Sequence, residues 1–411
     1  CVPAGDDYIR RFGEMRGGRG RQYINARREF SPVAVLNSMN SMRASFALTR
    51  SSGRGSSYSS AEDKVTLALI EAGYDPMFIS DEQVAAGELD TKGVRALFLP
   101  KTLSLGYGDK TGGLAVKPAL ERFLNQKGLV VATDDFAYDE FLQPRKPDAP
   151  FSDRIVKFDA IQSLDETLSQ AGVRLPVVVK RADGTPVPKL EISVHRLTGE
   201  SGARIVTLIR PPVGTKEVVG GDGVIQIVPD NSGGEAVERA VVDLSSFGSV
   251  RYYRLRGVPL RDELATDVKL NSLVRTRPVS DTSGKLNVEL KAGDGFAIAV
   301  LPYQVKSVNV AGSVADRALT LQWTLAKDNA SKPFAPHVVN IRIYLPSDSN
   351  ANSPLVCRYA FNSETQPDGR GRVELPLSLP ELELIKKGGR IRADVQDILT
   401  GGYATTEIRG R

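Results

Sequence analysis

The hydrophobic period of the chain changes near Gly172, and this change limits the folds that its 411 residues can adopt. Before that point, short apolar runs alternate with segments whose apolar residues recur every three or four positions, as they do in helices. After it, short runs of alternating apolar and polar residues are separated by turn residues, and helical periodicity is absent. A multidomain chain is therefore predicted, with an α/β part followed by an all-β part.

The first part is predicted to form a flavodoxin-like parallel sheet with helices on both faces. Helices are expected after Ser60, where Gly73 ends the pattern, and over 81–87, where Ser80 and Gln83 form a capping box. A third helix is expected over 114–126. Apolar runs predict the strands between them, at 33–37, 77–79, 95–99 and 129–132. Strands and helices joined by short connections are typical of parallel sheets.

The second part is predicted to form two antiparallel β-sandwich domains, of which the last is immunoglobulin-like in size and pattern. The strands at 190–196 and 203–210 are expected to pair as a hairpin. Further strands of this domain are predicted at 224–228, 237–244, 249–255, 286–290 and 296–301. Those of the last domain are predicted at 319–325, 337–345, 356–361, 372–377 and 390–395, before a closing hairpin over 392–406. The domain boundaries are set at 31–172, 173–305 and 306–411.

Residues 1–30 are predicted to be a basic linker from a missing upstream region. The stretch 10–28 holds seven arginines and one acid, Glu14. Such a stretch can bind RNA through its charge, but an exposed connector is the simpler interpretation. The chain begins with Cys1 and not Met, which we interpret as a truncation, although a mature bacterial lipoprotein also begins with Cys.

The overall composition gives little support for nucleic acid, a membrane or a disulfide framework. The net charge of +5 is mild for this length, and no apolar run is long enough to span a bilayer. The two cysteines, Cys1 and Cys357, fall in different predicted domains. The compartment stays open, with a periplasmic or secreted location favoured.

A parallel sheet places functional groups at the carboxyl ends of its strands, so the loops 38–45, 100–112 and 133–142 are the candidate region. The loop 106–113 lacks the ending of a phosphate-binding loop. Acids in the last loop can perform acid–base chemistry or hold a cation, but a solvated acidic loop is commoner. The candidate residues are Asn40 and Arg43 from the first loop, and Asp134, Asp135 and Tyr138 from the last.

No catalytic, cofactor-binding or metal-binding set is predicted. Amidotransferase chemistry needs a Cys and a His, and the α/β part contains no His and only the terminal Cys1. His195 and His337 lie in separate β domains, without the spacing of zinc ligands. Trp323 can stack on a sugar ring, but a core position is the favoured interpretation.

Residues 31–145 resemble the trimerisation domain of the family 42 glycoside hydrolases, the β-galactosidase-like enzymes. The resemblance rests on SPVAVLNSMNSMRASFAL (31–48), EAGYDPMFISDEQVAAGELDTKGVRALFLP (71–100) and ALERFLNQKGLVVATDD (119–135). More weakly, FAIAVLPYQVKSV (296–308) and VQDILTGGYATTEI (395–408) resemble the β domains that follow.

This resemblance implies an amidotransferase-like fold without amidotransferase chemistry, and assembly into a trimer. In that family, catalysis lies in an upstream (β/α)₈ barrel on two carboxylates. No position of this chain matches the barrel motif, so no catalytic residue is carried over. The family's Gln/aromatic pattern after the first strand is replaced by Met39-Asn40-Ser41-Met42, which puts contacts to a neighbouring subunit's active site in doubt.

Three functions therefore remain open. The chain is expected to be the non-catalytic assembly and accessory part of a β-galactosidase-like glycoside hydrolase, as a homo-oligomer. It can instead be a polysaccharide-binding or surface structural protein, with carbohydrate as its partner. The third alternative is a stand-alone hydrolase that uses the acidic loop 133–142.

Overall fold

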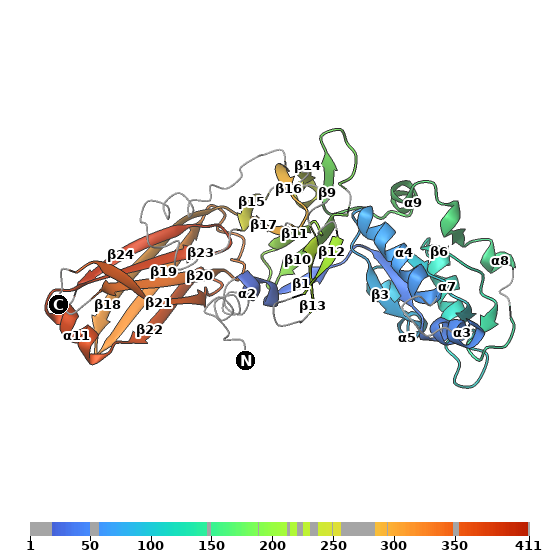
Figure 1. The fold of residues 1–411 in the computed structure, drawn as a ribbon, viewed down its shortest axis with the longest axis horizontal. Coiled ribbons are helices and arrows are strands. Elements are labelled where there is room, and N and C mark those ends of the chain that lie inside the picture. Colours follow the sequence, from blue (N-terminus) through green and yellow to red (C-terminus); the bar gives the residue numbers. More distant parts are fainter. Residues whose placement is uncertain are drawn as a thin grey trace.

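The chain folds into three parts that follow one another in a row (Figure 1). We call them the α/β unit (31–172), the middle β unit (26–29 with 177–303) and the C-terminal β unit (305–409). The computed structural model describes residues 19–49, 57–145, 149–187, 189–211, 214–219, 225–230, 237–248, 250–255, 284–293, 295–347 and 353–409.

The α/β unit is built on a five-stranded parallel sheet with the order β3-β2-β4-β6-β8. Its strands are β2 (Val33–Asn37), β3 (Met77–Ser80), β4 (Ala96–Leu99), β6 (Leu129–Ala132) and β8 (Val156–Lys157). In chain order this is 2-1-3-4-5, a common order of doubly wound sheets. The four strands predicted from the sequence are confirmed, whereas β8 was missed because two residues carry no recognisable pattern.

Helices cover both faces of this sheet. Val33 and Val35 pack in one apolar cluster with Val65 of α4 (Ser57–Glu71), whereas Ala34 and Leu36 pack in another with residues of α7 (Val116–Asn125). The other helices are α3 (Met39–Thr49), α5 (Asp81–Ala85), α6 (Glu88–Thr91), α8 (Ala149–Ser152) and α9 (Leu164–Gln170). In the described ranges, no helix is long and apolar enough to cross a bilayer.

The starts of helices α5 and α4 can be compared with the starts that the sequence predicts. The capping box predicted for α5 is confirmed, since Gln83 N donates to Ser80 Oγ at 3.3 Å and Ser80 N donates to Gln83 Oε1 at 3.0 Å. Helix α4 begins at Ser57, earlier than predicted, because serines at a helix start are compatible with both loop and helix.

The middle β unit contains two antiparallel sheets that share an apolar cluster. The larger has the order β1-β10-β11-β17-β15 and the smaller the order β16-β14-β9. The strands are β1 (Ala26–Glu29), β9 (Val178–Arg181), β10 (Glu191–Leu197), β11 (Arg204–Ile209), β14 (Glu238–Asp243), β15 (Arg251–Leu255), β16 (Lys285–Leu290) and β17 (Gly295–Leu301). A separate hairpin joins β12 (Gly214–Val219) and β13 (Ile225–Asp230). The predicted pairing of β10 with β11 is confirmed.

The prediction of a linker is wrong for residues 19–29. They form α2 (Arg19–Ile24) and β1, and Arg28 of β1 is paired with His195 of β10. Charged side chains are common on an edge strand, because only its backbone has to pair with the sheet. The α/β unit is thus inserted between β1 and the rest of its sheet. Residues 1–18, with Cys1 and the first arginines, lie outside the described residues.

The C-terminal β unit also consists of two antiparallel sheets, with the orders β18-β19-β22 and β21-β20-β23-β24. The strands are β18 (Val305–Ala315), β19 (Ala318–Lys327), β20 (Val338–Pro346), β21 (Leu355–Glu364), β22 (Arg370–Pro376), β23 (Arg390–Asp397) and β24 (Tyr403–Arg409). Every strand predicted for this unit is present. Helix α11 (Leu379–Lys386), which follows Ser378, was not predicted.

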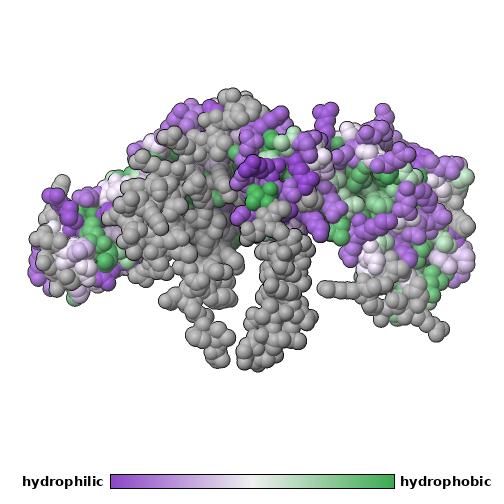
Figure 2. Space-filling model, turned by 45° about the horizontal axis from the view of Figure 1, so that its top comes forward, coloured by the Kyte–Doolittle hydropathy of each residue, from purple (hydrophilic) through white to green (hydrophobic). Residues whose placement is uncertain are grey.

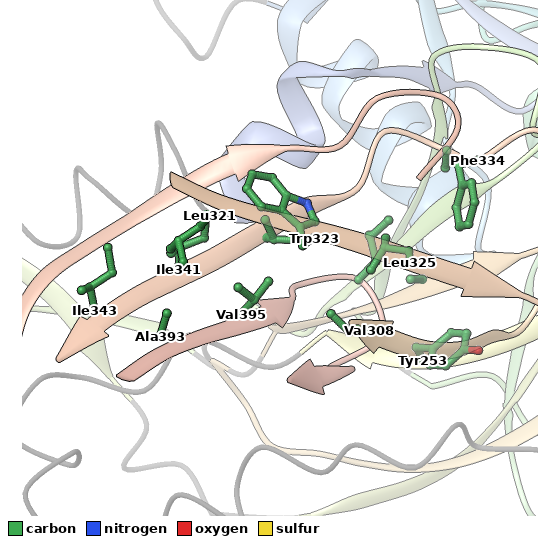
Figure 3. Packing of buried hydrophobic residues seen from close by; sticks show 14 of the residues in the cluster. Tyr253, Val308, Leu321, Trp323, Leu325, Phe334, Ile341, Ile343, Ala393 and Val395 are labelled. Atoms are coloured by element: carbon green, nitrogen blue, oxygen red, sulfur yellow. The ribbon is translucent and has the colours of Figure 1, made fainter. Parts of the chain in front are cut away.

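One apolar cluster continues from the middle β unit into the C-terminal β unit. It contains Ile205 and Tyr253 from the former and Trp323 and Ile341 from the latter (Figure 3). Trp323 is only 2% exposed, so the core interpretation of this residue is confirmed and its ring is not on the surface. The two β units therefore share a core.

A buried polar chain lies at the same junction. The Nδ1 atom of His337 is 2.8 Å from Asp397 Oδ1, and its Nε2 atom is 2.9 Å from the hydroxyl of Tyr303. Tyr303 also accepts a hydrogen bond from Ala335 N at 2.7 Å. Both ring nitrogens of His337 thus have a hydrogen-bond partner within the chain. This arrangement fixes the connection between β17 and β18, and supports a structural role for His337.

The close approach of Gly371 to Trp323 gives a test of this core. A Cβ at Gly371 would overlap the Trp323 ring, whereas a Cβ at Gly295 of β17 would lie 3.6 Å from its nearest neighbour, an ordinary contact. We expect Gly371→Ala to lower the free energy of unfolding by about 1–3 kcal/mol through overpacking. Gly295→Ala, the control, should change it far less. Urea unfolding measures both, and equal effects would contradict the packing described here.

Candidate functional site

The carboxyl ends of β2 and β4 form the point where the strand order reverses, which is where doubly wound sheets bind ligands. Ser38 follows β2 directly, and Asp81 follows β3, the neighbour of β2 on its other side. Both side chains are buried. This edge of the sheet is therefore the first place to examine for chemistry.

Asp81, Ser38 and Tyr58 form a closed set of hydrogen bonds at this edge. Ser38 Oγ donates to Asp81 Oδ2 at 2.8 Å, and Ser38 N donates to the hydroxyl of Tyr58 at 2.6 Å. The Tyr58 hydroxyl in turn donates to Leu36 O at 3.0 Å. The backbone N of Asn40 lies 3.5 Å from Asp81 Oδ2. Each polar group thus has a partner in the chain, and the serine faces no imidazole that can activate it.

Burial changes the acidity of this set. It raises the pKa of Asp81 to about 6, although the hydrogen bonds from Ser38 and Asn40 oppose this change. Burial also raises the pKa of Tyr58 well above its ordinary value. The pKa of Glu62, in the neighbouring helix α4, is raised mainly by burial as well. Carboxyl groups whose pKa is raised in this way can act as acids near neutral pH, provided that a substrate reaches them.

A second set of hydrogen bonds joins all three candidate segments, 38–45, 100–112 and 133–142. Ser41 Oγ donates to Ser104 O at 3.2 Å, and Ser104 N donates back to Ser41 Oγ at the same distance. Ser104 Oγ donates to Asp139 O at 2.8 Å. Ser104 lies in β5 (Ser104–Leu105), which pairs in parallel with β7 (Tyr138–Asp139). These contacts tie the three candidate segments to one another beyond the end of β4.

Asp139 organises the tip of the last loop. Its Oδ1 atom accepts from Phe141 N and Gln143 N at 2.9 Å each, and its carboxylate pairs with Lys110. Burial alone would raise its pKa, but these hydrogen bonds outweigh burial and hold the pKa of Asp139 below its ordinary value. The carboxylate is thus kept charged by contacts that shape the loop.

The structure separates the residues that the sequence singled out. The prediction of a loop over 38–45 is wrong, because Asn40 and Arg43 both lie on helix α3. Asn40 lies beside Asp81, whereas the side chain of Arg43 is exposed. Asp134 accepts from Thr133 at 2.7 Å, and the exposed Asp135 pairs with Lys157. Tyr138 lies in β7. The carboxylates of the acidic loop thus have separate partners, and none of these contacts brings two of them together.

Ser38 and Asp139 lie in segments that the sequence indicated as candidates but were not selected, and Asp81 was missed. Asp81 directly follows a strand, as functional carboxylates of such sheets do, but its sequence pattern also suits the first turn of a helix. The described residues contain no group of three His, Cys, Asp or Glu side chains suited to a metal ion.

The raised pKa of Asp81 predicts a specific dependence of stability on pH. Its folded pKa of about 6 lies above the ordinary value of 3.8, so the folded state holds the proton more tightly than the unfolded state. The stabilisation is present below about pH 4 and is lost as the pH rises through 6. We expect Asp81→Asn to remove about 2–3 kcal/mol of this dependence. Urea unfolding across pH 4–7 measures it.

The matched control is Asp159→Asn, since the Asp159 side chain is 78% exposed. This variant should keep the pH dependence of the natural chain. The account of Asp81 is wrong if both variants lose the dependence, or if neither does.

No protein-family model and no curated protein matches the chain. Among solved structures, it is similar to a catalytic mutant of Gan42B, a GH42 beta-galactosidase from G. stearothermophilus. The identity is 10% and the TM-score 0.38, over 66% of this chain and 40% of that chain. It is also similar to a beta-galactosidase from Bifidobacterium adolescentis, at 17% identity and a TM-score of 0.22, over 51% of this chain and 86% of that one.

The adhesin InvE of Yersinia pseudotuberculosis matches at 12% identity and a TM-score of 0.21, over 52% of this chain and 55% of that chain. The chain thus spans less than half the length of the Gan42B structure that it matches. At these scores the function has to be argued from the chain's own residues.

Proposed function

We propose that the chain is a non-catalytic assembly and accessory region of a β-galactosidase-like glycoside hydrolase. In this proposal the amidotransferase-like α/β unit joins copies of the protein, and the immunoglobulin-like β units extend from it. The family comes from the resemblance of residues 31–145, and so does a trimer as the expected assembly. The support from the chain's own residues is the surface of the α/β unit.

Large apolar side chains reach the surface of the α/β unit, as Figure 2 shows. Phe46 of α3, Leu67 of α4 and Phe78 of β3 are each more than half exposed. β3 is also the outer strand of its sheet, and among the described strands it pairs with β2 alone. An open strand edge that carries an exposed phenylalanine is the kind of surface that a second protein chain covers. This observation carries the proposal.

The carboxyl edge of the sheet also supports a non-catalytic role. Ser38, Ser41 and Asp139 are occupied by hydrogen bonds within the chain. Hydrolysis of a glycoside needs two carboxylates facing one bond, with one of them protonated. Asp134 and Asp135 do not provide this pair, because they have separate partners and Asp135 is exposed. A stand-alone hydrolase is therefore the weaker proposal.

The assembly role predicts the effect of a charge at the open edge. We expect Phe78→Asp to weaken self-association of the full chain at least about tenfold, because a carboxylate would have to be desolvated in the contact. Since Phe78 is 53% exposed, the unfolding temperature should hardly change. Sedimentation velocity over a concentration series measures the association.

Leu379→Asp is the control for this experiment. Leu379 is 61% exposed, but it lies on α11 of the C-terminal β unit. Its replacement should leave the association unchanged. A natural chain that stays monomeric at tens of micromolar would refute the assembly role, and equal effects of the two variants would refute its location.

A further inference from the structure

A crevice lies at the junction of the α/β unit and the middle β unit, where α4 and α9 adjoin β9 and β10 (Figure 1). Its volume is about 270 Å³. This is the space of about nine water molecules, which suits a ligand of about ten non-hydrogen atoms. Ligand sites of proteins occur preferentially at such junctions. We call it the junction crevice.

The floor of the junction crevice is apolar and belongs to both units. Leu175 packs against an apolar cluster of the α/β unit, and Ile192 packs against the cluster of the middle β unit. A Cβ at Gly73 would lie 3.5 Å from Leu175 and 3.8 Å from Ile192, so both side chains reach the end of α4. The other buried apolar residues of the lining are Val177, Val179, Val187 and Leu190. An apolar group in the crevice would therefore displace water from both units.

Three charged side chains border the same crevice. Glu71 is the last residue of α4, Asp165 lies in the first turn of α9, and Lys180 lies in β9. All three are exposed to solvent. Among the described residues, none of the three forms an ion pair. Their charges are thus open to a ligand that enters the crevice.

The wall formed by α4 and α9 favours a cation. The C-terminal end of a helix carries a partial negative charge, and the last turn of α4 contains no basic residue to balance it. Burial is the main cause that raises the pKa of Tyr74, and the charge of Asp165 and a hydrogen bond with it raise this pKa further. The Asp165 carboxylate is thus held beside a buried hydroxyl. A cation at this wall would meet Glu71, Asp165 and the end of α4.

The opposite charge of Lys180, which belongs to the other unit, narrows the choice of ligand. A simple cation leaves Lys180 without a partner, and a simple anion meets two carboxylates. A hydrocarbon uses none of the three charges. A small molecule that carries an ammonium group, a carboxylate and an apolar body matches both the charges and the floor.

We propose that the junction crevice binds a free amino acid with an apolar side chain, its ammonium group at Glu71 and Asp165 and its carboxylate at Lys180. Because these residues come from two units, the bound ligand joins the α/β unit to the middle β unit and stabilises their junction. The site is independent of the proposed assembly, since Phe78 does not line the crevice.

The test measures binding of L-leucine and L-phenylalanine to the full chain by calorimetry, at ligand concentrations up to about 10 mM. Isoamylamine, which lacks the carboxylate of leucine, and isocaproate, which lacks its ammonium group, should each bind at least about tenfold more weakly than L-leucine. The unfolding temperature should rise with the concentration of L-leucine, because the ligand binds the folded chain alone.

Substitutions at the border locate the site. Glu71→Gln, Asp165→Asn and Lys180→Gln should each weaken binding of L-leucine at least about fivefold. Their side chains are exposed, so the unfolding temperature without ligand should hardly change. The controls are Glu166→Gln, beside Asp165 on α9, and Lys306→Gln on the C-terminal β unit. Both residues are exposed and neither lines the crevice, so binding should stay within about twofold.

Three outcomes overturn the proposal. The first is a natural chain that binds neither amino acid at the highest concentration. The second is isoamylamine or isocaproate binding as tightly as L-leucine, which would show that one of the two charges is not recognised. The third is equal binding by the border variants and the controls, which would place the amino acid elsewhere on the chain.

Discussion

The two β units depend on a sheet that is buried on both faces. In β11, Ile205 packs in the cluster that continues to Trp323, whereas Val206 packs in the core of the middle β unit. Because neighbouring residues of a strand face opposite sides, the inner strands β11 and β17 have to supply apolar residues at consecutive positions. The shared core therefore sets the position of the C-terminal β unit, and the chain Tyr303–His337–Asp397 fixes the connection between them.

An ion pair joins the α/β unit to the middle β unit at its insertion point. Arg28 of β1 donates to both carboxylate oxygens of Asp75, at 2.9 and 2.6 Å, and Asp75 N donates to Ser31 Oγ at 3.0 Å. Glu29, the neighbour of Arg28 on β1, accepts a hydrogen bond of 2.6 Å from Arg204 of β11. Paired arginine–carboxylate contacts fix direction as well as distance. Arg28, from the basic segment that was predicted to be a linker, thus connects two units of the fold. The charge of the segment alone did not predict this structural role.

The difference between what sequence predicted and what it missed follows from the range of the interactions. Strands such as β2 and β19 were predicted because their burial pattern is repeated in their own residues. β1 was missed because its charged residues are held by pairing with β10, more than 160 residues away. The same holds for the site. Asn40 was placed at the right edge of the sheet, although it lies in helix α3 and not in a loop. The partnership of Ser38 with Asp81 depends on two strands being neighbours, which no local pattern reveals.

The polar groups at the carboxyl edge of the α/β unit differ in whether the chain itself satisfies them. At the carboxyl edge of the α/β unit, the serines and Asp139 bond to one another and to the backbone, so a ligand there would have to break existing bonds. Buried atoms without a hydrogen-bond partner in the described chain nevertheless occur in the same loops, in Thr102 and Glu140. The serines and Asp139 therefore give no support for a ligand site, and the exposed apolar residues of the α/β unit remain the surface that suits contacts with other protein chains.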